Sequence, residues 1–239
     1  RFTGLLVCSK RREEAFCMNR FKEQAMKIVF MVAACASVLA VFLICLFLFA
    51  NGIPAIAKIG PLKFVLGTVW KPSNDKFGIF PMIIASIYVT GGAILVGVPI
   101  ALLTSVFMAR YCPQKIYRPL KSGIELMAGV PSIVYGFFGL VLMVPLIRNT
   151  YGGTGTSWLA ASLLLGIMIL PTIIGPTESA LRSVPESYYE GSLALGATKE
   201  RSIFVVMLPA AKSGILAAVV LGIGRAIGET MAVIMVAGN

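Results

Sequence analysis

Long apolar runs separated by short polar segments dominate this chain of 239 residues. An α-helix needs about 20 mostly apolar residues to cross the hydrocarbon core of a bilayer. Glycine and proline inside such runs do not exclude a helix, because neighbouring helices can satisfy the backbone groups they free. The pattern therefore predicts an all-α integral membrane protein, a polytopic helical bundle. Its five predicted spans are residues 28–50, 80–109, 123–147, 158–176 and 214–238.

Composition agrees with a bilayer as the solvent. Hydrophobic residues make up 58% of the chain and charged residues 13%, which excludes an ordinary soluble domain. The first apolar run is too long for a signal peptide and follows a charged lead. We expect a lead at 1–27, a first transmembrane helix at 28–50, an external loop at 51–79 and a core of further spans at 80–239. Because the chain stops directly after an apolar run, we expect the natural sequence to continue beyond Asn239.

The net charge of +11 invites a nucleic-acid interpretation, but the distribution of the basic residues argues against it. Most of the lysines and arginines lie before the first span, between the second and third, and between the fourth and fifth. Cytoplasmic segments of membrane proteins are enriched in these residues. The charge pattern thus predicts a multi-pass protein in contact with lipid, with a cytoplasmic N-terminus, a cytoplasmic loop at 183–212 and no nucleic-acid partner.

The loop at 183–212 carries helix signals although it is polar. Ser183, Pro185 and Glu186 form a typical helix start, and the helix is expected to run to about Leu195. Gly196 supplies a flexible turn position. The loop keeps apolar residues that suit docking into a groove on another protein. These residues are Leu193, Leu195, Ile203 and Phe204.

Two charged residues interrupt the last apolar run. A charge at the bilayer centre costs about 2.5–3.5 kcal/mol on insertion scales, so such residues usually face a bundle interior or a watery path. The i, i+4 spacing of Arg225 and Glu229 predicts that they share a helix face, where each offsets the other's charge. Arginine matches the oxygens of an oxyanion. The alternative is an ion pair that fixes helix packing, which Gly224 and Gly228 would allow by close helix contact.

Other chemistry is weakly represented. Glu125 and Glu178 lie near predicted span ends, where interfacial carboxylates are the default interpretation. The chain has no histidine, which removes histidine-based catalysis, and no paired-cysteine spacing, so we expect no metal site. No phosphate-binding Gly-x-x-x-x-Gly-Lys loop occurs, so the chain is not an ATPase. These observations argue against an enzyme, and we expect no cofactor.

Family resemblance adds a function to this pattern. Glu190, Gly196, Leu208 and Pro209 fall where the EAA loop of ABC-importer permeases has Glu, Gly and the closing Leu-Pro. From about Phe64 onward, the chain resembles the PstC-type permease subunits of bacterial phosphate ABC importers. The motifs that carry this resemblance are Phe64-Val-Leu-Gly67-Thr-Val-Trp70-Lys-Pro72, Phe77-Gly78-Ile79, Gly129-Val-Pro-Ser-Ile-Val-Tyr-Gly136, the EAA loop and Gly224-Arg-Ala-Ile-Gly-Glu-Thr-Met-Ala-Val233.

The resemblance implies a type I importer core of six helices, with the sixth beyond this chain, in the bacterial cytoplasmic membrane. It implies a second permease subunit of the PstA type, two copies of a PstB-type ATPase that dock on the EAA loop, and a PstS-type external phosphate-binding protein. It also places Arg225 and Glu229 on the phosphate path. The alternatives are a permease for molybdate, sulfate or another solute, and an ion-driven carrier or channel.

Overall fold

A computed structural model describes residues 3–71 and 76–238, and this part of the chain is almost entirely helical. The prediction of an all-α membrane protein is confirmed. Among the described residues, four helices are long and apolar enough to cross a membrane, or five if one pair bent by 73° counts as a single span. The candidate spans are Lys22–Ile59, Phe80–Tyr111, Ser132–Thr150, Trp158–Ser183 and the bent pair Lys199–Ala210 with Lys212–Gly228. The chain divides into two compact units, Arg1–Phe80 and Pro81–Asn239.

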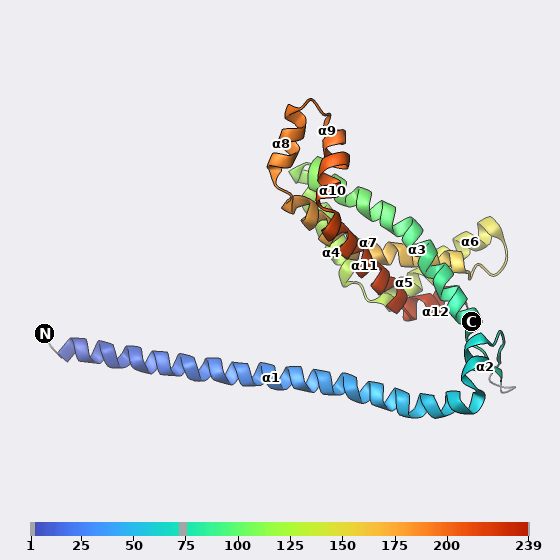
Figure 1. Ribbon diagram of the computed structural model, residues 1–239, viewed down its shortest axis with the longest axis horizontal. Helices are drawn as coiled ribbons and strands as arrows, with labels where there is room; N and C mark the ends of the chain where they lie inside the picture. Colours follow the sequence, from blue (N-terminus) through green and yellow to red (C-terminus); the bar gives the residue numbers. More distant parts are fainter. Residues whose placement is uncertain (1–2, 72–75, 239) are drawn as a thin grey trace. The chain divides into compact units, whose positions relative to one another are not determined.

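The first unit contains one long helix, α1 (Thr3–Ile59), drawn in blue in Figure 1. The helix continues well past residue 50, where an external loop was expected, because the apolar run tolerates Pro54 inside it. It ends at Gly60, whose φ of 92° an ordinary side chain rarely adopts. The short elements α2 (Pro61–Leu66), β1 (Trp70–Lys71) and β2 (Lys76–Phe77) follow. Pro72, at the end of one quoted motif, lies outside the described residues.

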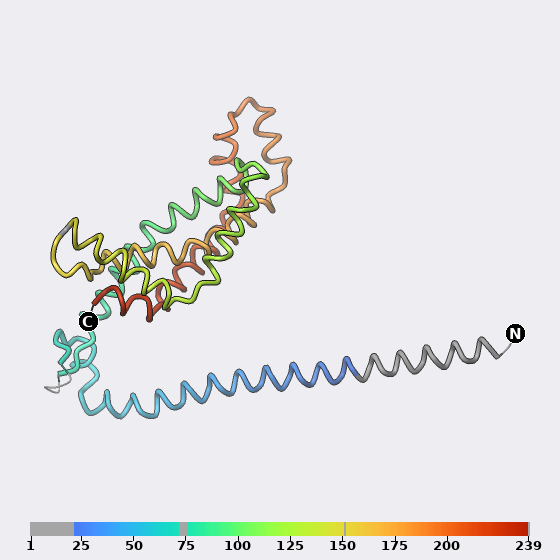
Figure 2. Tube along the Cα trace, turned by 180° about the vertical axis from the view of Figure 1, so that it is seen from behind, coloured from blue at the N-terminus to red at the C-terminus, as the bar shows by residue number. Residues whose placement is uncertain are grey.

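The second unit is a bundle of helices and π-helical turns. Its elements are α3 (Phe80–Val106), η2 (Phe107–Tyr111), α4 (Gln114–Gly129), α5 (Ser132–Phe138), η3 (Gly139–Met143), α6 (Val144–Tyr151), α7 (Trp158–Ser183), α8 (Glu186–Ala194), α9 (Lys199–Arg201), η4 (Ser202–Met207), α10 (Leu208–Ala210), α11 (Lys212–Gly228) and α12 (Met231–Ala237). Figure 2, from the opposite side, shows α8 and α9 as a hairpin at one end of this unit, beside the end of α3.

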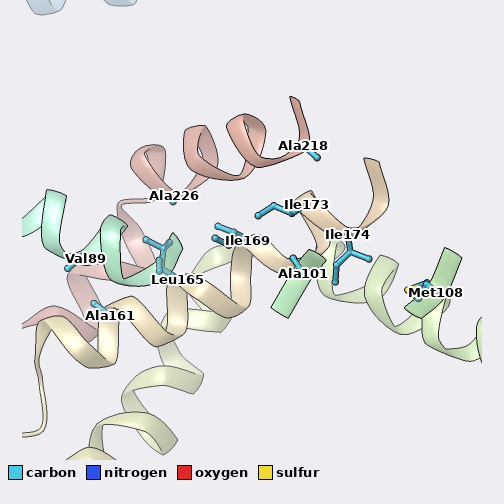
Figure 3. Packing of buried hydrophobic residues seen from close by; sticks show 11 residues of the cluster. Val89, Ala101, Met108, Ala161, Leu165, Ile169, Ile173, Ile174, Ala218 and Ala226 are labelled. Carbon is cyan, nitrogen blue, oxygen red and sulfur yellow. The ribbon is translucent and has the colours of Figure 1, made fainter. Parts of the chain in front are cut away.

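Helix α7 forms the centre of the second unit. Its buried residues Leu165, Ile169 and Ile173 pack with residues of α3 and α11 in one apolar cluster (Figure 3). Small residues permit this close packing, as expected in a bilayer, where apolar surface alone does not drive helices together. A Cβ atom added to Gly97 of α3 would lie 2.9 Å from the backbone oxygen of Gly166 on α7. Close backbone contact therefore fixes how α3 crosses α7.

The third predicted span, 123–147, is wrong in its boundaries. The chain breaks between α4 and α5, and the candidate span here begins at Ser132. Proline disfavours the helical region for the residue before it, and Val130 accordingly adopts an extended conformation ahead of Pro131. The hydroxyl of Tyr135 donates to the carbonyl oxygen of Met127 at 2.9 Å, which satisfies a backbone group at the broken end.

The last predicted span, 214–238, is also interrupted. Helix α11 ends at Gly228, Glu229 is extended at φ −79° and ψ 120°, and α12 starts at Met231. The carboxylate of Glu229 accepts a hydrogen bond from the backbone N–H of Ala232 at 3.3 Å. Glu229 therefore supports the start of a new helix rather than continuing the old one.

Candidate coupling loop and membrane path

The helix predicted in the polar loop is present and has the predicted bounds to within one residue. Pro185 stands at the N-cap of α8, and Glu186 occupies its first turn, where a carboxylate favours the helix dipole. At the other end, Gly196 has a φ of 83°. Its N–H donates to the Leu193 carbonyl at 2.9 Å, and the N–H of the next residue donates to Ser192 at 3.1 Å. These two bonds form a Schellman turn, which requires the left-handed conformation that glycine adopts most easily.

After this turn, the chain continues through α9, η4 and α10 toward α11. The hydroxyl of Thr198 accepts from the N–H of Arg201 at 3.3 Å and caps the returning helix. Leu208 and Pro209 lie in α10, immediately before the 73° bend into α11. Residues 186–210 thus form one hairpin, here called the α8–α10 hairpin. The sequence-predicted residues Glu190, Gly196, Leu208 and Pro209 all belong to it.

An apolar cluster packs the α8–α10 hairpin against the ends of helices α3 and α7. Ile203 and Met207 are fully buried on the hairpin side of this cluster. They pack with Val106 of α3 and Leu181 of α7, and Leu208 packs against the cluster from its edge. The hairpin is therefore a packed extension of α3 and α7 rather than a loose connection between spans.

A salt bridge joins the same elements. The Nη1 atom of Arg110, in η2, donates to both carboxylate oxygens of Glu186, at 2.9 and 3.1 Å. Its Nη2 atom donates to the carbonyl of Leu181 at 3.5 Å, and the guanidinium lies 5.6 Å from the ring centroid of Tyr189. One arginine at the end of α3 therefore contacts both α7 and the first helix of the hairpin.

Glu178 belongs to a second polar cluster, which sequence reasoning missed. Its side chain is buried, with 4% of the residue exposed, and its predicted place at the membrane interface stays a prediction. One carboxylate oxygen accepts from Tyr117 of α4 at 2.6 Å and from Nε of Arg182 at 2.7 Å. Arg182 also donates to the carbonyl of Met108 at 3.0 Å. The i, i+4 spacing of Glu178 and Arg182 was the available signal in the sequence.

Lys121 completes this cluster from α4. Its Nζ lies 3.1 Å from the Tyr117 hydroxyl, and this hydrogen bond, followed by the charge of Glu178, raises the pKa of Lys121 above its usual value. The cluster therefore ties α4, α7 and η2 together beside the α8–α10 hairpin. Because these residues are far apart in sequence, only the fold brings them into contact.

The outer face of the α8–α10 hairpin is apolar at several positions. Leu195, at the tip, is 90% exposed, and Tyr188, Phe204 and Val205 are also exposed. Glu190 is exposed and has no ion-pair partner among the described residues. Of the four apolar positions predicted to dock into a partner, Leu195 and Phe204 face outward, whereas Ile203 is buried in the hairpin's own cluster.

Arg225 and Glu229 are not brought together as predicted. The helix ends between them, and no salt bridge joins them in the part of the chain that the structure describes. Arg225 is half-buried, and its Nη1 donates to the hydroxyl of Thr172 on α7 at 3.2 Å. Glu229 instead lines a cavity of about 380 Å³ together with Ser86 and Thr90 of α3. The expected mutual charge compensation is therefore absent from this arrangement.

Comparisons with known proteins identify the family of this chain. Residues 101–239 match the family described as "Binding-protein-dependent transport system inner membrane component". The chain is 40% identical over 215 residues to the probable ABC transporter permease protein YqgH of Bacillus subtilis, covering 87% of this chain and 70% of the relative. It is 32% identical over 212 residues to the phosphate transport system permease protein PstC of Mesorhizobium japonicum, covering 80% and 64%.

Among solved structures, the chain resembles an inward-facing MetNI methionine ABC transporter, with 25% identity and a TM-score of 0.49 over 63% of this chain and 68% of that one. The chain spans 64% to 70% of the length of the two curated relatives named above. The family match covers more than half of the chain and includes the whole α8–α10 hairpin. This chain belongs to the family of binding-protein-dependent transport system inner membrane components.

Proposed function

We propose that this chain is the permease subunit of an ATP-driven importer whose cargo is inorganic phosphate, and that Arg225 lies on the phosphate path. The observation that carries this proposal is the unused hydrogen-bonding capacity of Arg225. A guanidinium has five N–H donors. Among the described residues, only the Thr172 hydroxyl accepts from it. Such an arginine, without a carboxylate partner, is suited to receive an oxyanion in a bidentate manner.

The similarity to permeases named for phosphate transport supports phosphate over molybdate or sulfate as the cargo. Glu229 lines the neighbouring cavity. Its negative charge would weaken the binding of the anion and so limit how tightly the anion is held. Membership of a binding-protein-dependent family disfavours the ion-driven carrier or channel. The expected setting is the bacterial cytoplasmic membrane, with the N-terminus on the cytoplasmic side according to the distribution of basic residues.

The energy would come from partner subunits. We infer that the exposed face of the α8–α10 hairpin docks in a groove of an ATPase, with Leu195 as its anchor and Glu190 as a polar contact. Two ATPase copies would close on ATP and move this hairpin and that of a second permease subunit. An external binding protein would deliver the anion to the opposite side.

The contacts between the hairpin and helices α3 and α7 would transmit this movement to the membrane helices. Arg110 links Glu186 to the end of α3, and the apolar cluster around Ile203 links the hairpin to α7. Because the apolar contacts are buried and Nη1 of Arg110 donates to both carboxylate oxygens of Glu186, the hairpin would move with α3 and α7 as one body. Helix α7 contacts Arg225 through Thr172, so the same motion would reach the proposed anion path.

The cargo is tested by labelled phosphate uptake in the full-length parent assembled with its partner subunits, with molybdate and sulfate as competitors. Arg225→Gln should reduce uptake about tenfold or more, because a charged hydrogen bond worth about 1.5–3 kcal/mol is lost. Arg148→Gln is the matched control, since Arg148 is an exposed arginine of α6. Uptake that depends on ATP but carries another anion would reject phosphate and keep the permease. Uptake unchanged by Arg225→Gln would leave Arg225 with a packing role.

Coupling is tested separately through Leu195. Leu195→Ser should weaken binding of the ATPase about tenfold, because an exposed apolar anchor is lost, while membrane insertion stays normal. Lys199→Ser, at an exposed position of the same hairpin, is the matched control. Co-purification of the ATPase and the ratio of transported anion to hydrolysed ATP measure the effect. Normal coupling in Leu195→Ser would refute the assignment of this face.

A further inference from the structure

The motifs that follow α1 have no role in the function proposed above. Their described residues, 60–71 and 76–79, build a compact element in which Gly67 and Gly78 lie in backbone contact. A Cβ atom on Gly78 would come within 2.3 Å of the Gly67 carbonyl carbon. The N–H of Ile79 donates to the Phe64 carbonyl at 3.0 Å, and that of Gly78 donates to Val69 at 3.1 Å. These contacts close the element into a defined shape.

The strand pair belongs to the same element. Trp70 and Phe77 are opposite each other in the β1–β2 pair, and their rings meet edge to face at 5.8 Å between centroids. Such aromatic pairs add stability beyond the area they bury. The element is therefore a fixed structure after α1, although it contains only two short strands and one turn of helix.

This element contains a concave basic pocket with a volume of about 490 Å³. Three lysines from three parts of the chain line it: Lys58 at the end of α1, Lys63 in α2 and Lys76 in β2. The apolar walls come from Ile59, Val69 and Phe77. The pocket thus combines several ammonium groups with apolar surface.

The lysines around the basic pocket are unusual for their position in the chain. Residues 52–79 contain four lysines and one carboxylate, Asp75, which lies outside the described residues. Helix α3 starts directly after this element and reaches the α8–α10 hairpin at its other end. Helix α3 is a candidate span, so the residues before it are expected on the other face of the membrane from those after it, and basic residues are normally depleted on the outer face. The lysines of the pocket are an exception to this rule, and a bound anionic ligand would account for them.

The length of the apolar run in α1 places the expected membrane boundary near Lys58, which lines the pocket. No charged residue occurs between Lys27 and Lys58, a stretch of about 45 Å at 1.5 Å per helical residue, against a hydrocarbon core of about 30 Å. Lys58 is thus expected at the head-group layer. Leu62 and Leu66 of α2 are 75% and 59% exposed, and Trp70 is also exposed. Exposed leucines and tryptophan beside lysines are typical of segments that lie in the membrane interface.

We propose that the basic pocket binds the phosphate group of an anionic phospholipid. The lysine ammonium groups would donate to the phosphate oxygens, and their apolar stems would lie along the pocket wall. The exposed leucines of α2 would contact the lipid's acyl chains. A freely diffusing phosphate ion or an acidic protein surface would not account for these leucines, so the combination favours a lipid. The bound lipid would hold the outer end of α1 at a fixed depth in the membrane.

The test uses the full-length transporter, assembled with its partners and reconstituted with phosphatidylglycerol and phosphatidylcholine. After extraction in mild detergent, native mass spectrometry counts the retained phosphatidylglycerol. The triple variant Lys58→Gln, Lys63→Gln, Lys76→Gln should lower its occupancy about tenfold or more, since each lysine near an anionic lipid contributes to binding. Lys71→Gln is the matched control, because Lys71 pairs with Lys76 in the hairpin but does not line the pocket.

Additional measurements distinguish a bound lipid from a free anion or a docked protein. The same three positions changed to arginine should restore retention, and co-purification of the partner subunits shows whether each variant still assembles. Unchanged lipid retention in the assembled triple variant would overturn the proposal. Displacement of the lipid by excess inorganic phosphate would also overturn it, in favour of a free-anion site. Loss of the external binding protein from the variant, with lipid retained, would identify a protein-docking surface instead.

Discussion

The span in helix α1 is more hydrophobic than the span in helix α7, but it is less buried. The candidate span in α1 is the more apolar, yet none of its most apolar window is buried within the chain. In the span formed by α7, 61% of the corresponding window is buried. In water the more apolar helix would be expected inside, but a bilayer removes that driving force, because lipid tails are as apolar as leucine. Hydrophobicity therefore identifies both helices as spans without saying which one forms the core.

The difference lies in surface shape. Helix α7 meets α3 through Gly166 and Gly97, and a Cβ atom on Gly222 of α11 would come within 2.5 Å of Ile173. The hydroxyl of Ser162 donates across to the Val89 carbonyl at 3.1 Å. Helix α1 has large side chains such as Phe42 and Phe47, both of which are exposed. Small residues and interhelical hydrogen bonds, rather than hydrophobicity, select the central helix.

The largest expected effect comes from removing apolar volume in each helix. Leu165→Ala in α7 should destabilise the folded permease by about 2–5 kcal/mol, because it leaves a cavity in the buried cluster. Leu43→Ala in α1 removes a similar volume from an exposed position and should change stability by less than about 0.5 kcal/mol. Unfolding of the assembled transporter in detergent measures both. Equal losses would show that α1 is also buried in the assembly.

Replacing glycine with alanine should destabilise the protein where α3 crosses α7 and stabilise it slightly in α1. Gly97→Ala should cost about 1–3 kcal/mol, because the new methyl group would press on the backbone of α7. Gly52→Ala in α1 meets no atom within 4 Å and should stabilise the helix slightly, since alanine is the better helix former. Thermal unfolding of the two variants measures both changes in stability. A stabilising Gly97→Ala would contradict the observed close crossing of α3 and α7.

Buried polar contacts give the next test. Glu178→Ala should cost about 2 kcal/mol, because the Tyr117 hydroxyl and the Arg182 guanidinium lose their shared acceptor. Glu125→Ala removes an exposed carboxylate of α4 and should stay within about 0.5 kcal/mol. Denaturant unfolding compares the two, and Glu178→Gln shows how much an uncharged acceptor restores. If both alanine variants behave alike, Glu178 contributes no more than a surface carboxylate.

The smallest effect concerns a glycine needed for its conformation rather than for packing. Gly196→Ala should cost about 1 kcal/mol, because alanine is strained at a φ of 83° although nothing lies within 4 Å. Gly191→Ala, inside α8 and equally uncrowded, should be neutral or slightly stabilising. Limited proteolysis of the α8–α10 hairpin reports the difference locally. A stable Gly196→Ala variant would mean that the turn tolerates another conformation.

Local features of the fold were predictable because neighbouring residues determine them. Pro185 and Glu186 mark the start of α8, and Gly196 marks its end, since the proline and glycine act on the backbone directly. The positions of the spans followed from the lengths of the apolar runs. The break at Glu229 was not predicted, whereas Pro131 is a visible signal for the break ahead of α5. Periodicity treats the apolar residues on both sides of a break alike, so it cannot show that the helix stops.

The sequence by itself determined that this chain is a polytopic membrane protein with a helix–glycine–helix segment in the polar loop before its last apolar run, because these properties depend on composition and local backbone preference. Only the tertiary structure decided that Arg225 contacts Thr172 rather than Glu229, and that Glu178 meets Tyr117. It also decided that Arg110 joins the membrane helices to the hairpin. These contacts connect distant parts of the chain, and their geometry depends on how helices cross. In a bilayer the fit of small residues sets that crossing, and no local pattern encodes it.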